Sequence, residues 1–292
     1  MRKTLGVVLA AVALGGCGGG AAQKQADVCA AAWDGGVTAV NGEIAVLDEA
    51  GPVLAQRKTD ADKAVSAAEK RLAGLTIKRD EALASYPDKV KGRVVSAKMR
   101  VGGIQPMREE SGKPFAPIRY DLEIQGEHAR VSKALAALYE QPKAIQLDRV
   151  EVNITDERKG WAITKVQFRV FTLTEPQPAP AAEPAVPASY TAALAWAPAG
   201  DCATAPVPSS MTEARAALQE REAIAKSVRS VEAIEDVAKS RNALADDLVR
   251  KRDDDRALWT AHADSIVENA KKSVTGLAEL RFNAKGEPDW RN

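Results

Sequence analysis

Few residues in this chain have the types and spacing that catalysis or metal binding needs. The two histidines, His128 and His262, are far apart in the sequence. No Cys-x-x-Cys, His-x-x-x-His or Glu-x-x-His metal spacing occurs, and neither does a Gly-x-Ser-x-Gly motif or a glycine-rich phosphate loop. The densest carboxylate run is residues 253–255, and it is more typical of a solvated helix face than of a calcium site. We therefore expect a protein that is not an enzyme, with no catalytic residue, cofactor or metal, and we interpret His128 as a surface residue at a helix start.

The first residues follow the order of a secretory signal. Arg2 and Lys3 give a positive start, residues 5–14 form an apolar or small run of ten, and two glycines precede Cys17. Ten residues are too few for a membrane span, which needs about 20. Residues 1–16 are therefore predicted to be a signal peptide that is removed.

The residues around the predicted cleavage site, Leu14-Gly15-Gly16-Cys17, resemble the lipobox of bacterial lipoproteins. The resemblance implies diacylglycerol on the Cys17 thiol, cleavage before Cys17 and acylation of the new amino terminus. Several acyl chains hold a protein on a membrane where one would let go. Because Gly18 is not aspartate, the lipoprotein sorting rule implies the periplasmic face of the outer membrane, with the inner membrane as the alternative. An ordinary secretory signal with a chance cysteine is the competing interpretation.

Cys29 and Cys202 are the remaining cysteines, and an exported protein can join them in a disulfide. A bridge would close a loop of well over 100 residues, which the chain-entropy model values at about 4–5 kcal/mol. The alternative is two unpaired thiols.

The composition limits the function classes and the fold. Without residues 1–16 the 41 basic residues fall to 39 against 40 acidic ones, so the mature charge is −1 and nothing suggests nucleic-acid binding. Aromatic residues make up 4% of the chain, so Ala, Val, Leu and Ile must build the core. This composition favours helices with a small sheet over a large β-sandwich.

The chain then changes character several times. After a tether at residues 17–27, residues 28–88 are predicted to be helical, because apolar residues recur at three- and four-residue steps. Gly51-Pro52 is predicted to separate two helices. The second helix ends at Pro87, and a short coiled-coil-like seam runs along it through Val65, Ala68, Leu72 and Leu75.

Residues 89–174 are predicted to form an α+β domain. Alternating apolar residues predict strands at 95–101, 118–124, 145–154 and 161–173, with a helix at 131–138 between the second and third. The alternation slips between Leu147 and Val150, which indicates a β-bulge. Together with the preceding helix, the order is αββ-αββ, which predicts a four-stranded antiparallel ferredoxin-like sandwich.

The last part of the chain is predicted to be a linker and then helices. Residues 175–209 are rich in Pro and Ala, which is typical of an extended, semi-rigid spacer. Residues 210–292 are predicted to be helical. They open with a capping box at Ser210 and continue as one long helix, or as two joined near residues 253–255, with Gly276 as the one breaker before Leu280.

Residues 45–173 resemble the PilO family of type IV pilus assembly and type II secretion platform proteins. The resemblance rests on a strand ending at Gly126, a helix through Leu135, a turn bounded by Pro142 and a strand reading Leu147-Asp148-Arg149-Val150. It implies a ferredoxin-like core behind coiled-coil helices, no active site, and a scaffold that dimerises and aligns partners in the periplasm. This chain departs from the family in having Ala134 where phenylalanine is expected and a lipobox instead of a transmembrane helix.

These observations lead to two expectations about function. The first is a non-enzymatic, lipid-anchored periplasmic scaffold that binds envelope proteins as a homo- or heterodimer, in a pilus or secretion machine. The alternative is an envelope lipoprotein that binds a small molecule or cell-wall ligand in a pocket lined by Trp196, Tyr190 or Trp161.

Overall fold

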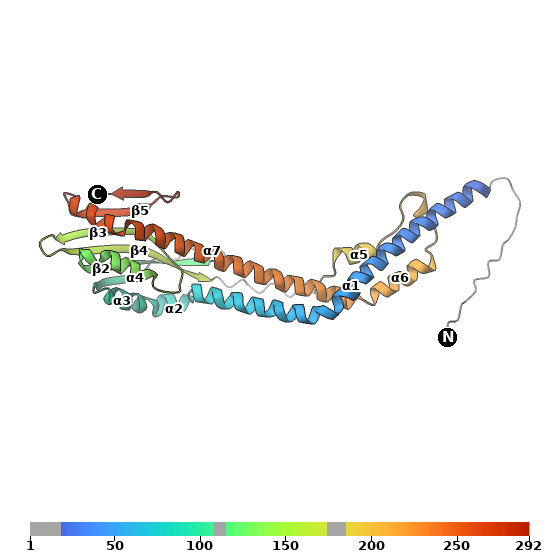
Figure 1. Ribbon diagram of the computed structural model, residues 1–292, viewed down its shortest axis with the longest axis horizontal. Helices are drawn as coiled ribbons and strands as arrows, with labels where there is room; N and C mark the ends of the chain where they lie inside the picture. The colour runs from blue at the N-terminus through green and yellow to red at the C-terminus, as the bar shows by residue number, and fades with distance from the viewer. Residues whose placement is uncertain (1–18, 108–114, 174–184, 292) are drawn as a thin grey trace. The chain divides into compact units, whose positions relative to one another are not determined.

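The computed structural model describes residues 19–107, 115–173 and 185–291, and they form two compact units. Unit 1 is Met1–Lys58 with Glu183–Glu232, and unit 2 is Thr59–Ala182 with Ala233–Asn292. Two long helices, α1 (Gly19–Leu75) and α7 (Glu222–Lys272), each contribute residues to both units (Figure 1). Within the described residues, no helix is both long enough and apolar enough to cross a membrane.

Unit 1 is helical. The first part of α1 packs against α5 (Ala188–Leu194), α6 (Ser209–Gln219) and the start of α7, and η2 (Gly200–Cys202) lies between α5 and α6. Its core is a set of buried residues, seven apart on α1 and matched by residues of the other helices: Trp33, Val40, Leu47, Tyr190, Ala193, Met211, Ala214, Leu218 and Ala225. The predicted apolar stripe of the first helix is therefore confirmed as a core-facing stripe.

The prediction of a helix break at Gly51-Pro52 is wrong, because α1 is continuous through Pro52. Leu54 is buried just beyond the proline, and a Cβ on Gly51 would lie 3.6 Å from the Ile224 side chain on α7. Tertiary packing on both sides of the proline outweighs the one backbone hydrogen bond that proline removes.

Unit 2 holds a six-stranded, fully antiparallel sheet in the order β1-β2-β4-β3-β5-β6. Its strands are β1 (Arg100–Pro106), β2 (Phe115–Glu127), β3 (Ile145–Asp156), β4 (Trp161–Leu173), β5 (Leu277–Phe282) and β6 (Pro288–Arg291). Between them lie α2 (Arg79–Ala84), α3 (Tyr86–Ser96), η1 (His128–Arg130) and α4 (Val131–Tyr139). The α+β class is confirmed, and so is the bulge in β3, where the pairing with β4 shifts between Leu147 and Arg149.

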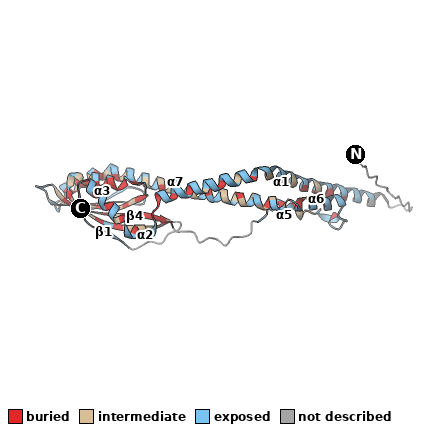
Figure 2. Cartoon of the chain, turned by 90° about the horizontal axis from the view of Figure 1, so that it is seen from below, coloured by how far each residue is buried: buried red, intermediate tan, exposed pale blue. Residues whose placement is uncertain are grey.

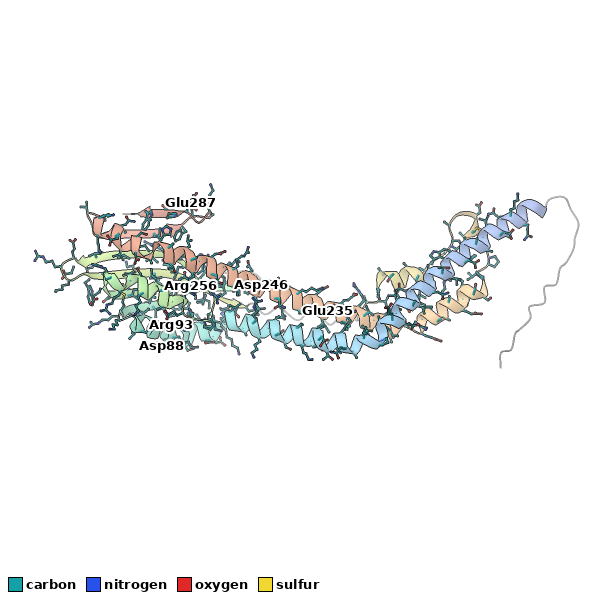
Figure 3. The ribbon with its side chains drawn as sticks, viewed as in Figure 1. Asp88, Arg93, Glu235, Asp246, Arg256 and Glu287 are labelled. Carbon is teal, nitrogen blue, oxygen red and sulfur yellow. A yellow bond between two sulfur atoms is a disulfide. The ribbon has the colours of Figure 1, made fainter. Side chains whose placement is uncertain are left out.

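Helices cover one face of this sheet. Val90 of α3, Leu135 of α4 and Ile266 of α7 join Tyr120, Phe168 and other inward strand residues in one buried cluster (Figure 1). The predicted coiled-coil-like seam also lies in unit 2. Its Leu72 and Leu75 pack with Ala245 and Leu248 of α7. Arg71 pairs at 2.7 Å with Asp246, which is labelled in Figure 3.

Two predictions for unit 2 are wrong. The expected first strand, residues 95–101, is instead the end of α3 followed by β1, because Val90 and Val94 are both buried at helical spacing. The four-stranded sandwich is a six-stranded sheet, because the C-terminal residues form the β5–β6 hairpin rather than helix, and β5 pairs with β3. Gly276, at a φ of +66°, lies between α7 and β5, and a Cβ there would lie 2.9 Å from the Ile154 carbonyl oxygen.

The predicted spacer at residues 175–209 is partly folded. Residues 174–184 lie outside the described part of the chain, and the rest contains α5 and η2. The predicted C-terminal helix is two helices, with the break at residues 220–221 rather than near residue 253.

Candidate interaction surface

The two cysteines that are not assigned to lipid form a disulfide in unit 1. Cys29 on α1 and Cys202 in η2 are both buried, with an S–S distance of 2.06 Å across a sequence separation of 173 residues. The predicted bridge is therefore present in the structure. Cys17 and Gly18, which carry the predicted lipid and sorting signal, lie outside the described residues.

The two histidines are not brought together in one site. His128 lies in η1, where its backbone N–H donates to the Gly160 carbonyl at 2.8 Å. His262 on α7 packs against the rings of Phe282 and Trp290 beside the C-terminal hairpin. In the part of the chain that the structure describes, no group of three or more His, Cys, Asp or Glu residues could hold a metal ion.

One of the three consecutive aspartates departs from the prediction of a solvated face. Asp253 and Asp254 are exposed, but Asp255 is only 8% exposed. Its carboxylate accepts hydrogen bonds from the Tyr139 hydroxyl and, at 2.9 Å, from the Leu147 backbone N–H at the bulge of β3. Asp255 therefore links α7 by hydrogen bonds to both α4 and the sheet.

Electrostatics make Asp255 an unusual carboxylate. Burial raises its pKa to about 6, while the hydrogen bonds from Tyr139 and Leu147 oppose this rise. One turn further along α7, the Trp259 indole N–H donates to the Leu147 carbonyl at 3.2 Å. The spacing of Asp255 and Trp259, four residues apart on a predicted helix, was the signal in the sequence that both face the sheet.

The uncovered face of the sheet is charged and largely paired with itself. A shallow groove there is lined by Gly102, Glu123, Glu151, Lys165 and Gln167 among others. Arg149 donates to both Glu151 and Glu279, and Arg281 also donates to Glu279. Burial opposes ionisation of Glu279, yet Arg281 and Arg149 hold its pKa below the usual value. The charged side chains on this face pair with one another, as expected for the solvated face of an antiparallel sheet.

The aromatic residues proposed for a ligand pocket do not converge. Tyr190 is buried in the core of unit 1, and Trp161 begins β4 in unit 2. Trp196 lies edge-on to Trp33, with ring centroids 5.8 Å apart, over Gly36. Two of the three residues therefore support packing in unit 1.

Unit 1 also has a second stripe on α1, on the face next to the buried one. We call it the α1 stripe, and its residues alternate at four- and three-residue steps: Val28, Ala32, Gly35, Ala39, Gly42, Val46, Glu49 and Val53. The side chains of Val28, Val46 and Val53 are 60%, 59% and 50% exposed. Figure 2 shows α1 largely exposed along its length.

The α1 stripe has the spacing of a coiled-coil seam. Alternating steps of three and four residues keep side chains on one face of a helix, and the stripe lasts three and a half such repeats. Exposed apolar residues that line up on one face of a helix mark protein contacts more often than singly scattered ones do. The sequence alone does not reveal this stripe, because its residues are small and the stronger core-facing stripe lies on the next face of the same helix.

Comparison with known proteins adds little. No family model matches the chain, and no curated protein matches its sequence. Among solved structures, the type 4 fimbrial biogenesis protein PilO from Pseudomonas aeruginosa is similar at a TM-score of 0.32 and 6% sequence identity, over 44% of this chain and 99% of that one. This likeness is too weak to assign a fold or a function to the chain.

Proposed function

We propose that this protein is a non-enzymatic, lipid-anchored scaffold of the bacterial periplasm that binds protein through the α1 stripe. The observation that carries the proposal is the exposure of Val28, Val46 and Val53 on a helix whose neighbouring face is already buried in a core. A helix with an exposed apolar seam is suited to packing against another helix.

The anchor is the second part of the proposal. The stripe begins eleven residues after Cys17, the residue that the lipobox resemblance assigns to lipid. The Cys29–Cys202 disulfide supports export, because such bonds persist in oxidising compartments and are rare in the cytosol. With Gly18 after the cysteine, we propose the periplasmic face of the outer membrane.

The machine that the scaffold serves is proposed from the sequence resemblance alone. Residues 45–173 resemble the PilO family, so a type IV pilus or related secretion apparatus is the first place to look for its partners.

The experiment that tests the contact surface is site-specific photocrosslinking in cells. A photoreactive amino acid at Val46 should give crosslinked species, and the same amino acid at the exposed Asn41, on a different side of α1, should give few. If position 46 yields no crosslinked protein of any kind, the scaffold proposal is wrong.

The experiment that tests the anchor is metabolic labelling with palmitate. Wild-type protein should incorporate the label and the Cys17→Ala variant should not. Equal labelling of both proteins would refute lipidation at Cys17.

A further inference from the structure

We infer that a groove in unit 1, between α1 and residues 201–208, binds an extended peptide segment that carries a basic side chain. The groove has a volume of about 600 Å³, within the range of about 300–1,000 Å³ that ligand pockets have. Trp161, Tyr190 and Trp196 are not among the described residues that line it, so it differs from the pocket expected from the sequence. The inference goes beyond the proposed function, because the groove lies on another face of α1 than the α1 stripe.

The walls of the groove are largely apolar. The wall on α1 is formed by residues at three- and four-residue steps, which lie on one face of a helix: Ala26, Cys29, Ala30 and Trp33. The opposite wall includes Pro206 and its neighbours in the segment that leads to α6. Such walls suit the apolar side chains and the aliphatic stems of a bound segment.

The disulfide holds the two walls together. Cys29 belongs to the α1 wall, and its partner Cys202 lies in the segment that forms the opposite wall. Because a covalent bond links the walls, the groove exists before a ligand arrives. A preformed site loses little conformational entropy on binding, which favours affinity.

Trp33 brings a hydrogen-bond donor that lacks an acceptor. Its side chain is only 5% exposed, and within the described part of the chain its indole N–H has no hydrogen-bond partner. Buried tryptophan N–H groups usually have one, as the indole of Trp259 does at the Leu147 carbonyl. A backbone carbonyl of a peptide in the groove would supply the missing acceptor.

Charge indicates that the ligand is basic. Each wall contributes one exposed carboxylate, Asp34 from α1 and Asp201 from the opposite segment. Neither forms an ion pair with a described residue, and no Lys or Arg is among the described residues that line the groove. In the same unit Asp48 is by contrast paired with Arg221 at 2.7 Å. A Lys or Arg side chain of the ligand would complete the charge balance at the rim.

A basic peptide satisfies all three features of the groove at once. It offers a carbonyl for the indole N–H, apolar atoms for the walls and a cation for the two carboxylates. A purely apolar ligand would leave the carboxylates and the donor unpaired, and a simple amine lacks the acceptor. An acidic segment would be repelled at the rim.

The first test is fluorescence anisotropy with the purified full-length protein in a mild detergent. The probe is a pool of short fluorescein-labelled peptides in which Lys or Arg alternates with Leu, Val or Pro, and a matched pool carries Asp or Glu instead. We expect saturable binding of the basic pool and no binding of the acidic one. If the basic pool does not bind, or both pools bind equally, the inference is overturned.

Two pairs of variants locate the site. The double change Asp34→Asn and Asp201→Asn should weaken binding about tenfold, because two exposed ion pairs are lost. Its control is Asp27→Asn, at an exposed position of α1 outside the groove, which should bind like wild type. Ala30→Arg places a side chain and a charge in the groove and should abolish binding, whereas Ala31→Arg, one residue away on another face, should not. Unchanged binding by Ala30→Arg, with an unchanged circular dichroism spectrum, would show that the peptides bind elsewhere and overturn the inference.

The second test follows the donor itself by NMR of protein with ¹⁵N-labelled tryptophan. The indole N–H signal of Trp33, assigned by its absence from Trp33→Phe, should move downfield when the basic pool is added. A signal that stays in place at saturation would refute the assigned hydrogen bond. A soluble short-chain phosphatidylethanolamine serves as the lipid probe. If it moves this signal and the peptides do not, the groove holds lipid and the inference is overturned.

Discussion

The pH dependence of stability in unit 2 should come largely from one buried carboxylate, Asp255. Its pKa rises from 3.8 to about 6 in the folded protein, chiefly because burial disfavours the charged form. Such a rise corresponds to about 3 kcal/mol of unfolding free energy. Because the folded state binds more protons than the unfolded state between these pKa values, stability should fall as pH rises from about 4 to about 6, and the full cost is present above that window.

The Asp255→Asn variant isolates this effect. Asparagine keeps an oxygen that can accept from Tyr139 and Leu147, but it cannot ionise. Relative to wild type, the variant should therefore gain up to about 3 kcal/mol between about pH 4 and about pH 7.5. Urea unfolding at the two pH values, followed by circular dichroism and tryptophan fluorescence, measures the difference.

The control is Asp253→Asn, two residues away on the exposed side of the same helix. It removes the same charge without changing a buried group, so its effect on stability should be small and nearly independent of pH. If the difference between Asp255→Asn and wild type is the same at both pH values, the buried-carboxylate reasoning is refuted.

Three further changes test unit 1 and the end of α1. Gly36→Ala places a Cβ about 2.2 Å from the Trp196 ring and should lower the free energy of unfolding by about 1–3 kcal/mol. Gly35→Ala is the control, because it has open space around it and should not destabilise the protein. Thermal unfolding compares the two variants. Cys29→Ser removes a bridge that closes a long loop and should lower the free energy of unfolding by about 5 kcal/mol. If the variant and wild type have the same mobility on non-reducing gels after alkylation, the bridge does not form. Lys143→Met removes the ammonium that donates to two carbonyls at the C-terminal end of α1, so hydrogen exchange there should accelerate; unchanged exchange would show that the cap is dispensable.

Much of unit 2 could be predicted because its signals are local. Helix α4 and strand β4 agree with their predicted ranges almost residue for residue. The bulge in β3 was predicted from the break in the alternation of apolar and polar residues after Leu147. The strand predicted at residue 95 failed because Val95, Ala97 and Met99 alternate while Val90 and Val94 recur at helical spacing. Over so few residues, the two-residue period of a strand and the three- to four-residue period of a helix cannot be told apart. The segment is helical because Val90 and Val94 are buried against the sheet.

The remaining errors concern contacts between distant parts of the chain. Nothing near Pro52 indicates that Leu54 is buried and that Ile224 packs over Gly51, yet these contacts keep α1 continuous. Similarly, β5 is stabilised by pairing with β3, more than 120 residues earlier. Asp255 belongs to the same group, because its two hydrogen-bond donors lie 108 and 116 residues away in the sequence.

The division of the chain into units also dictates the order in which it can fold during synthesis. Each unit combines an early and a late segment, so neither is complete until residue 232 has been made. The core of unit 1 is incomplete until Met211 and Leu218 have been made, because these residues pack against Trp33, Val40 and Leu47. In unit 2, β3 lacks one of its two neighbouring strands until β5 has been made. Domains usually fold one after another from the N-terminus. Here the core of unit 1 stays incomplete until Ala225 has been made, and the core of unit 2 until the last fifth of the chain has been made. The first half of the chain is therefore a natural client for a holding chaperone.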